Sequence, residues 1–329
     1  MSLRPLLIGL AFALATHPAA AQLGADAQRD FTEYENFAPH RAFVVSQDGR
    51  ATWWAGARGA DPAGAVERAL KACTEANRPE CRLHAVNNVP IPPGGDWQSL
   101  APPRLPEIGR LRAQPFWRNQ GPSTAAGLIV WSHGYLLGAD ATTSAPQPWV
   151  GRFTRAGYDL YRFDREYINN WPNDASQLAE AVRAAKAMGY RRVLLTGQSA
   201  GGWASVAATM RGAPVDGVVA IAPAHHGTTK NMRDTTIARS DWQQLVRGIK
   251  RGPRVAVVNF KDDDYDVGGR MKDASDAFAA AGVEGLVLDE PAGHKGHGAG
   301  NSFPFARQYR DCLFAFIETG ARQGPCAGP

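Results

Sequence analysis

The stretch RRVLLTGQSAGGWASVAATM, residues 191–210, decides how the second half of this chain folds. Val193-Leu194-Leu195 is a short apolar run, as expected of a strand that is buried on both faces. Gly202 to Ala208 can form a helix. Between the two lies Gly197-Gln198-Ser199-Ala200-Gly201, which fits the pattern G-x-S-x-G. A strand, a turn of small residues and a helix in this order predict a tight bend that presents the Ser199 hydroxyl.

Similar apolar runs recur on both sides of this stretch and alternate with helical patterns. That alternation is typical of a parallel sheet with crossover helices, so we predict an α/β fold with a doubly wound, mostly parallel sheet. The expected strands are 128–131, 158–163, 193–195, 218–221, 255–258 and 286–288, and the expected helices are 177–188, 274–281 and 305–317.

From Gly127 to Phe316 the chain resembles the α/β-hydrolase family. Besides the serine motif, Ser132-His133-Gly134-Tyr135 follows the run that corresponds to the family's third strand. The resemblance implies a serine hydrolase in which Ser199 is the nucleophile. It also implies that the backbone N–H groups of Tyr135 and Ala200 form the oxyanion hole, and that His133 is structural.

A serine nucleophile needs a base, and the base needs a carboxylate to orient it. The family places this acid after its seventh strand. Four aspartates follow the run 255–260 here, and the family spacing points to Asp263, with Asp264 next and Asp262 and Asp266 as weaker alternatives.

The family places the base after its eighth strand, where this chain offers His294 and His297. The segments around the two histidines each resemble a common family ending. We expect His297 to be the base, because it lies closer to the final helix and its glycine neighbours allow a close approach to the serine. His294 stays the alternative.

No metal or organic cofactor is expected. Asp262, Asp264, Asp266 and Asp273 approach the spacing of a calcium loop, but Val267 stands where such a loop requires glycine. His225 and His226 form a pair without an apparent third ligand.

Residues 1–21 are predicted to be a signal peptide. Arg4 supplies a positive charge, Leu6 to Ala15 is a short apolar run, and Ala19-Ala20-Ala21 is a small-residue cleavage site. We therefore expect a periplasmic or secreted protein whose mature chain starts at Gln22 and has no membrane span.

Residues 22–90 are predicted to form a small α+β module, 91–120 a linker rich in proline and glycine, and 121–329 the hydrolase domain. The module resembles small cysteine-paired domains of exported bacterial proteins. In an exported chain an even number of cysteines suggests disulfides, and loop closure favours the near-neighbour pairs Cys73–Cys81 and Cys312–Cys326. A zinc site is disfavoured, since no C-x-x-C spacing occurs.

The net charge of +5 is spread along the chain without a basic block, which does not support nucleic-acid binding. The expected function is hydrolysis of carboxylic esters through an acyl-enzyme. A serine exopeptidase or amidase with the same triad stays open, as does a non-catalytic exported binding protein on the same scaffold. The substrate and the oligomeric state are not predictable from these residues.

Overall fold

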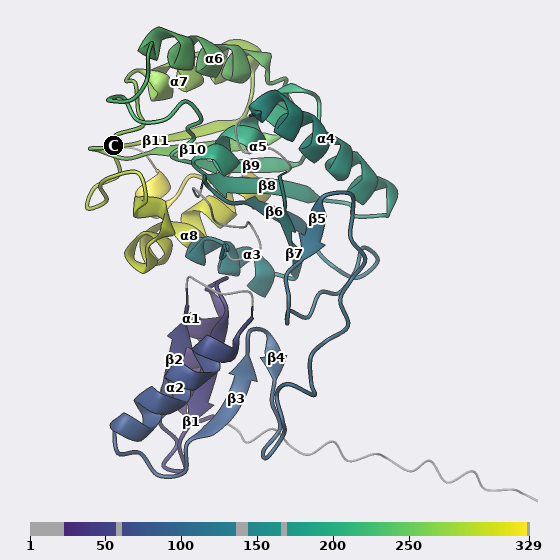
Figure 1. Cartoon of the computed structure of the whole chain (residues 1–329), viewed down its shortest axis with the longest axis vertical. Helices are drawn as coiled ribbons and strands as arrows, with labels where there is room; N and C mark the ends of the chain where they lie inside the picture. Colours follow the sequence, from purple (N-terminus) through teal and green to yellow (C-terminus); the bar gives the residue numbers. More distant parts are fainter. Residues whose placement is uncertain (1–22, 57–60, 136–143, 166–169, 328–329) are drawn as a thin grey trace, which may run out of the picture.

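The computed structural model describes residues 23–56, 61–135, 144–165 and 170–327. The predicted signal peptide, 1–21, lies outside these residues. Two sheets organise the described chain, a small one near the N-terminus and a large one that contains the serine motif (Figure 1). Nowhere in the described ranges does a helix have the length and apolarity to cross a membrane.

The large sheet has seven strands in the order β11-β10-β9-β8-β6-β7-β5, and only β5 runs antiparallel to its neighbour. The predicted doubly wound, mostly parallel sheet is thus confirmed, and all six expected strands are present. In spatial order the strands are β11 (Gly285–Asp289), β10 (Arg254–Asn259), β9 (Gly217–Ile221), β8 (Val193–Gln198), β6 (Gly127–Ser132), β7 (Tyr158–Phe163) and β5 (Leu111–Ala113).

Helices cover both faces of this sheet (Figure 1). Alternate residues of β6 show why: Leu128 and Val130 pack into one apolar layer, and Ile129 and Trp131 pack into the other. The first layer contains α4 (Trp171–Ala187), α5 (Ala200–Met210), α6 (Thr235–Gly248) and α7 (Arg270–Ala281), and the second contains α3 (Gly151–Arg155) and α8 (Phe303–Thr319).

The seventh strand corrects the expected linker. β5 (Leu111–Ala113) lies inside the segment 91–120 and pairs with β7, so the last part of that segment belongs to the large sheet. β5 contains no proline itself, and it forms one edge of the sheet.

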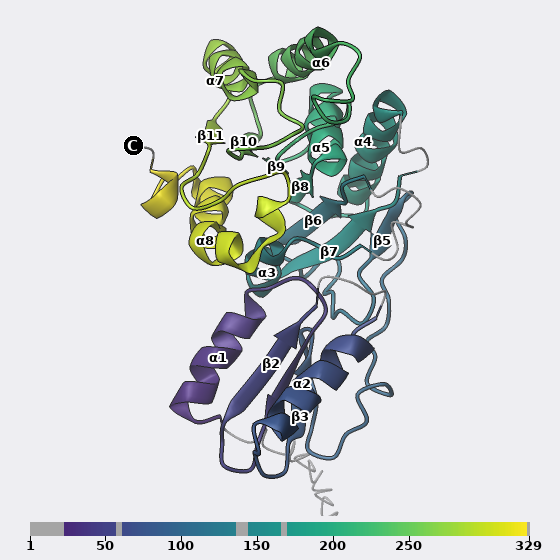
Figure 2. The same ribbon diagram turned by 60° about the vertical axis from the view of Figure 1, so that its left-hand side comes forward.

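The small sheet has the antiparallel order β2-β1-β3-β4. Figure 2 shows one helix on each side of it. The helix α1 was not predicted. The elements are α1 (Ala25–Glu35), β1 (Arg41–Val45), β2 (Ala51–Ala55), α2 (Ala63–Glu75), β3 (Arg82–Val86) and β4 (Val89–Pro90).

The two parts contact each other through the residues at the end of α1. Phe37 is fully buried, and its ring lies edge-on to that of Phe303 at the start of α8, with centroids 4.9 Å apart. Glu33 forms ion pairs with Arg307 and Arg310 of α8, at 2.9 and 2.6 Å. The small module therefore packs against the helical layer of the large sheet through both apolar and charged groups.

Both cysteine pairs are formed as expected. Cys73 of α2 is bonded to Cys81 just before β3, and Cys312 of α8 is bonded to Cys326. The first bond joins helix to strand in the small module, and the second holds the C-terminal segment against α8.

Candidate active site

Ser199 occupies the sharp turn between β8 and α5. Its backbone has φ 56° and ψ −124°, a left-handed conformation that a non-glycine residue adopts only where its surroundings enforce it. The Ser199 N–H donates to Ile221 O at 3.0 Å, and the Ser199 carbonyl accepts from Trp203 N at 2.9 Å and from Ala224 N at 3.2 Å. The turn is therefore anchored to β9, to the following loop and to its own helix.

The small residues of the motif are required by close contacts between backbones. A Cβ on Gly201 would lie 2.0 Å from Ser132 O, and a Cβ on Gly197 would lie 2.4 Å from the Gly201 carbonyl carbon. The first turn of α5 is therefore pressed against the end of β6, which places the segment after β6 beside the serine.

The structure brings Ser199, His297 and Asp263 together. His297 Nε2 lies 2.7 Å from Ser199 Oγ, and His297 Nδ1 lies 2.9 Å from Asp263 Oδ1. The imidazole is about one-fifth exposed, with 18% of its side-chain surface accessible, whereas the Asp263 side chain is fully buried. A buried carboxylate on one ring nitrogen and a serine hydroxyl on the other is the arrangement that nucleophilic catalysis by serine needs.

The loop after β10 holds Asp263 in place. Asp263 Oδ1 also accepts from Tyr265 N at 2.9 Å, and the Tyr265 ring stacks on the His297 ring with centroids 4.0 Å apart. Behind them the buried Arg270 donates to Asp266 Oδ1 at 2.7 Å and to Tyr265 O at 3.2 Å. The carboxylate and the imidazole are thus fixed by neighbours on the same loop.

The histidine loop is joined to the acid loop and to the serine turn. Gly296 N donates to Lys261 O at 2.8 Å. The Gln198 amide nitrogen donates to His297 O at 2.9 Å. Gln198 therefore ties the histidine loop to the serine turn. The sequence did not single it out, although its place next to Ser199 in the motif is a signal that could have found it.

Gly134, the middle residue of the predicted oxyanion segment His133 to Tyr135, lies beside the serine. A Cβ on Gly134 would stand 2.7 Å from Gln198 Oε1 and 3.3 Å from Ser199 Cβ. On the other side of Ser199, Ala200 is the first residue of α5, so its N–H has no partner within the helix. The two predicted oxyanion donors thus belong to the segments that flank Ser199.

A buried arginine supports this segment and was also missed. Arg165 Nη2 donates to Gly134 O at 3.0 Å and lies 3.1 Å from His133 Nδ1. Burial, together with the charge of Arg165, lowers the pKa of His133 to about 4. His133 is therefore neutral at pH 7.

The acidic neighbour of Arg165 lies at the upper limit of ion-pair distance. Asp174 on α4 approaches it to 3.9 Å, and both side chains are almost completely buried. Burial raises the pKa of Asp174 to about 7 against the opposing effect of Arg165. The arginine that supports His133 and Gly134 therefore has a buried acidic neighbour that is partly protonated at pH 7.

The alternative histidine points elsewhere. His294 is buried, its Nε2 lies 2.8 Å from Gln308 Oε1, and its ring contacts those of Phe305 and Tyr309. It packs against α8, whereas His297 reaches Ser199.

The alternative aspartates are exposed or pair with other residues. Asp264 is exposed, and Asp262 is exposed and lies 3.5 Å from Lys295. Asp266 pairs with Arg270. Of the four aspartates, the one with a bond to the imidazole is Asp263.

The residues considered for metal binding do not converge. Asp273 pairs with Arg239 at 3.0 Å, and His226 lies 3.1 Å from Asp241. Within the described ranges no group of three or more histidine, cysteine, aspartate or glutamate side chains is placed to hold a metal ion.

Comparison with known proteins gives structural neighbours only. No protein-family model and no curated protein matches the chain. A truncated carbohydrate esterase from gut microbiota is 17% identical, with 64% of this chain and 90% of that chain covered and a TM-score of 0.47. A lipase of Bacillus licheniformis is 15% identical, with coverages of 64% and 99% and a TM-score of 0.40.

A puromycin-hydrolyzing peptidase of Mycobacterium tuberculosis is 13% identical, with a TM-score of 0.49; the match covers 84% of this chain and 45% of that one. The names of all three neighbours denote hydrolases. At sequence identities this low, the matches bear on the fold alone.

The topology itself is specific. The sheet is parallel except for one edge strand, β6 lies between β7 and β8, and the serine turn follows β8. Asp263 and His297 follow β10 and β11, the last two strands in the chain. This chain has an α/β-hydrolase fold.

Proposed function

We propose that the protein is an exported serine hydrolase that cleaves carboxylic esters through an acyl-enzyme. The observation that carries the proposal is the continuous chain of contacts from Asp263 Oδ1 through His297 to Ser199 Oγ, at 2.9 and 2.7 Å. These distances lie within the reach that proton transfer between a nucleophile and its base requires.

The reaction begins when Ser199 Oγ attacks the ester carbonyl and His297 Nε2 takes the hydroxyl proton. Asp263 accepts the hydrogen bond from Nδ1–H, which keeps Nε2 free to act as base and stabilises the imidazolium that forms. The tetrahedral intermediate collapses when His297 returns the proton to the leaving alkoxide. Water then attacks the acyl-enzyme by the same sequence and releases the acid and free Ser199.

The oxyanion of both tetrahedral intermediates would be held by the N–H groups of Ala200 and Tyr135. Donors fixed at the place where charge develops contribute roughly 3 kcal/mol each in comparable sites. Support comes from the contacts that press Gly134 and Gly201 against their neighbours, since both donors belong to segments with little freedom to shift.

Esters are easier to cleave at such a site than amides, because an alkoxide is a better leaving group than an amide anion and the nitrogen of an amide must be protonated before it can leave. A cap domain over the site is not expected from the segment 222–253. Its helix α6 packs against α5 and α7 and so belongs to the helical layer. Export is supported by both disulfides, because such bonds persist in oxidising compartments.

Hydrolysis of p-nitrophenyl acetate tests the proposal. Ser199→Ala and His297→Ala should each lower kcat by at least about a thousandfold. His294→Ala is the matched control: it removes an imidazole from the same loop and should retain most of the wild-type kcat. Equal rates for wild type and Ser199→Ala, in folded material, would refute the proposal.

A panel of esters and aminoacyl p-nitroanilides then separates esterase from peptidase activity. A kcat/KM for anilides above that for esters would contradict the ester assignment while leaving the triad intact. Export is tested by N-terminal sequencing of the protein recovered outside the cytoplasm, which should begin at Gln22.

A further inference from the structure

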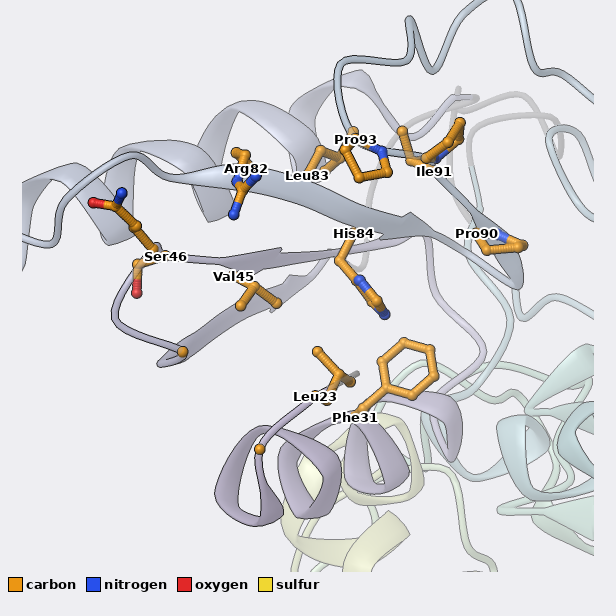
Figure 3. Close-up of a pocket in the computed structure, with 14 residues that line it drawn as sticks. Leu23, Phe31, Val45, Ser46, Arg82, Leu83, His84, Pro90, Ile91 and Pro93 are labelled. Carbon is orange, nitrogen blue, oxygen red and sulfur yellow. The ribbon is translucent and has the colours of Figure 1, made fainter. Parts of the chain in front are cut away.

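The small module contains a cavity of its own, of about 490 Å³, between α1 and the face of the sheet formed by β1 and β3 (Figure 3). All the residues that line it lie between Leu23 and Pro93, so it shares none with the serine site. Its volume is within the range of small-molecule sites. Leu23 and Phe31 form one wall, and Val45 and His84 face them from the sheet.

A β-bulge turns His84 into this cavity. In the pairing of β1 with β3, Phe43 lies opposite Ala85 and Val44 opposite Leu83, which leaves His84 as the extra residue. A bulge breaks the alternation of side chains and re-aims one of them. Here the His84 ring lies edge-on to the Phe31 ring, with centroids 5.3 Å apart.

The imidazole of His84 has no hydrogen-bond partner in the described part of the chain, although its backbone carbonyl accepts from Ile91 N at 2.9 Å. Partial burial lowers its pKa. A neutral imidazole has one N–H donor. In this apolar wall the donor stays without a hydrogen bond unless a ligand or a water molecule supplies an acceptor.

Among the residues that line the cavity, the one with a charged side chain is Arg82. Arg82 lies two residues before His84, is exposed, and forms no ion pair with any residue that the structure describes. Neither aspartate nor glutamate is among the lining residues. The hydroxyl of Ser46 is already bonded to Asp48 and to Arg50 O. The polar side chains left to bind a ligand are therefore the Arg82 guanidinium, the His84 imidazole and the Gln47 amide, and each of them can donate to an anionic acceptor.

We propose that this cavity binds a monocarboxylate with an apolar alkyl or aryl tail. The tail would lie between Leu23, Phe31 and Val45, and the carboxylate would accept from His84 and pair with Arg82. The proposal does not depend on the esterase assignment, because the two sites have no residue in common.

Isothermal titration calorimetry of the whole protein with 4-phenylbutyrate tests this inference. The matched neutral probe is 4-phenylbutyramide, which has the same tail and no charge. The acid should bind, and the amide should bind about two- to fivefold more weakly because it cannot pair with Arg82. Arg82→Gln should weaken binding of the acid about two- to fivefold. His84→Phe should weaken it at least about tenfold, since it removes a donor to a charged group.

Arg68→Gln is the matched control, because Arg68 is an exposed arginine of the same module on α2 and does not line the cavity. It should leave the affinity unchanged. Thermal melts establish that each variant is folded. Because Arg82 is exposed, we expect Arg82→Gln to fold, and this variant alone tests the proposal if His84→Phe does not fold. Absence of binding at millimolar acid, equal affinity for acid and amide, or an unchanged affinity in Arg82→Gln would each overturn the proposal.

Discussion

Gly201→Ala should disable the serine turn without touching the triad itself. The new Cβ would stand 2.0 Å from Ser132 O and 2.5 Å from the Ser132 carbonyl carbon, whereas real Cβ atoms essentially never approach another atom closer than 3.0 Å. The turn and the end of β6 must therefore separate by at least about 1 Å. Both partners are backbone atoms, so no side chain can rotate to relieve the overlap.

Two magnitudes follow from that displacement. Overpacking of this kind costs about 1–3 kcal/mol of unfolding free energy. A shift of about 1 Å between catalytic groups costs roughly a hundredfold in rate. We therefore expect kcat/KM for p-nitrophenyl acetate to fall about a hundredfold, with a lower urea midpoint.

Gly64→Ala is the control for this experiment. Gly64 is the second residue of α2 and has nothing within 4 Å of a Cβ placed on it, so alanine fits there without a clash and is the better helix former. It should retain full activity and gain a little stability. If Gly201→Ala keeps both wild-type kcat/KM and wild-type stability, the close contact between the turn and β6 does not exist as described.

Three further perturbations have distinct expected results. Asp263→Asn should lower kcat by about 10⁴-fold through the wrong imidazole tautomer, whereas Asp264→Asn, on the exposed neighbour, should be neutral; comparable losses in both would contradict the acid assignment. The pKa of His133 is lowered from 6.5 to about 4 by burial, so the folded state binds fewer protons than the unfolded state between these values and stability is lost as pH falls through them. Urea unfolding at pH 7 and pH 4 should therefore show wild type losing up to about 3 kcal/mol more than His133→Gln, and equal losses would refute the burial argument. Replacing Cys73 and Cys81 by serine opens a loop with a sequence separation of 8 and should cost about 2.5 kcal/mol of unfolding free energy, measured by the same titration; no loss would show that the bond does not constrain the unfolded chain.

The sequence predicted those features that local pattern determines. Central strands of a parallel sheet are buried on both faces, so runs such as Leu128 to Trp131 stand out against their surroundings. The serine turn was recognisable because the strand, the motif and the helix follow one another directly in the sequence, and Gly197 is required by its contact with the nearby Gly201.

Elements that depend on distant partners were missed. β5 has three residues and exists only through its pairing with β7. The helix α1 has a mostly polar sequence, and its buried residues are Ala27 and Tyr34, so its apolar stripe is too sparse to identify without the sheet that it covers.

The choice between neighbouring candidates was likewise set by packing. His294 and His297 differ because Gln308 and the aromatic rings of α8 hold the first of them away from the serine. Asp263 faces the imidazole whereas its neighbour Asp264 is exposed. The loop that contains both of them is held by the hydrogen bond from Arg270 to Tyr265 O. Neither contact has a signature in the local sequence, and the family spacing was the reason for preferring Asp263.

Labelling with a fluorophosphonate tests most directly whether Ser199 is an activated nucleophile. The folded, disulfide-bonded protein should take up one phosphonyl group, located on Ser199 by peptide mass spectrometry, and Ser199→Ala should take up none. A folded wild-type protein that stays unlabelled, or one labelled at another residue, would contradict the account.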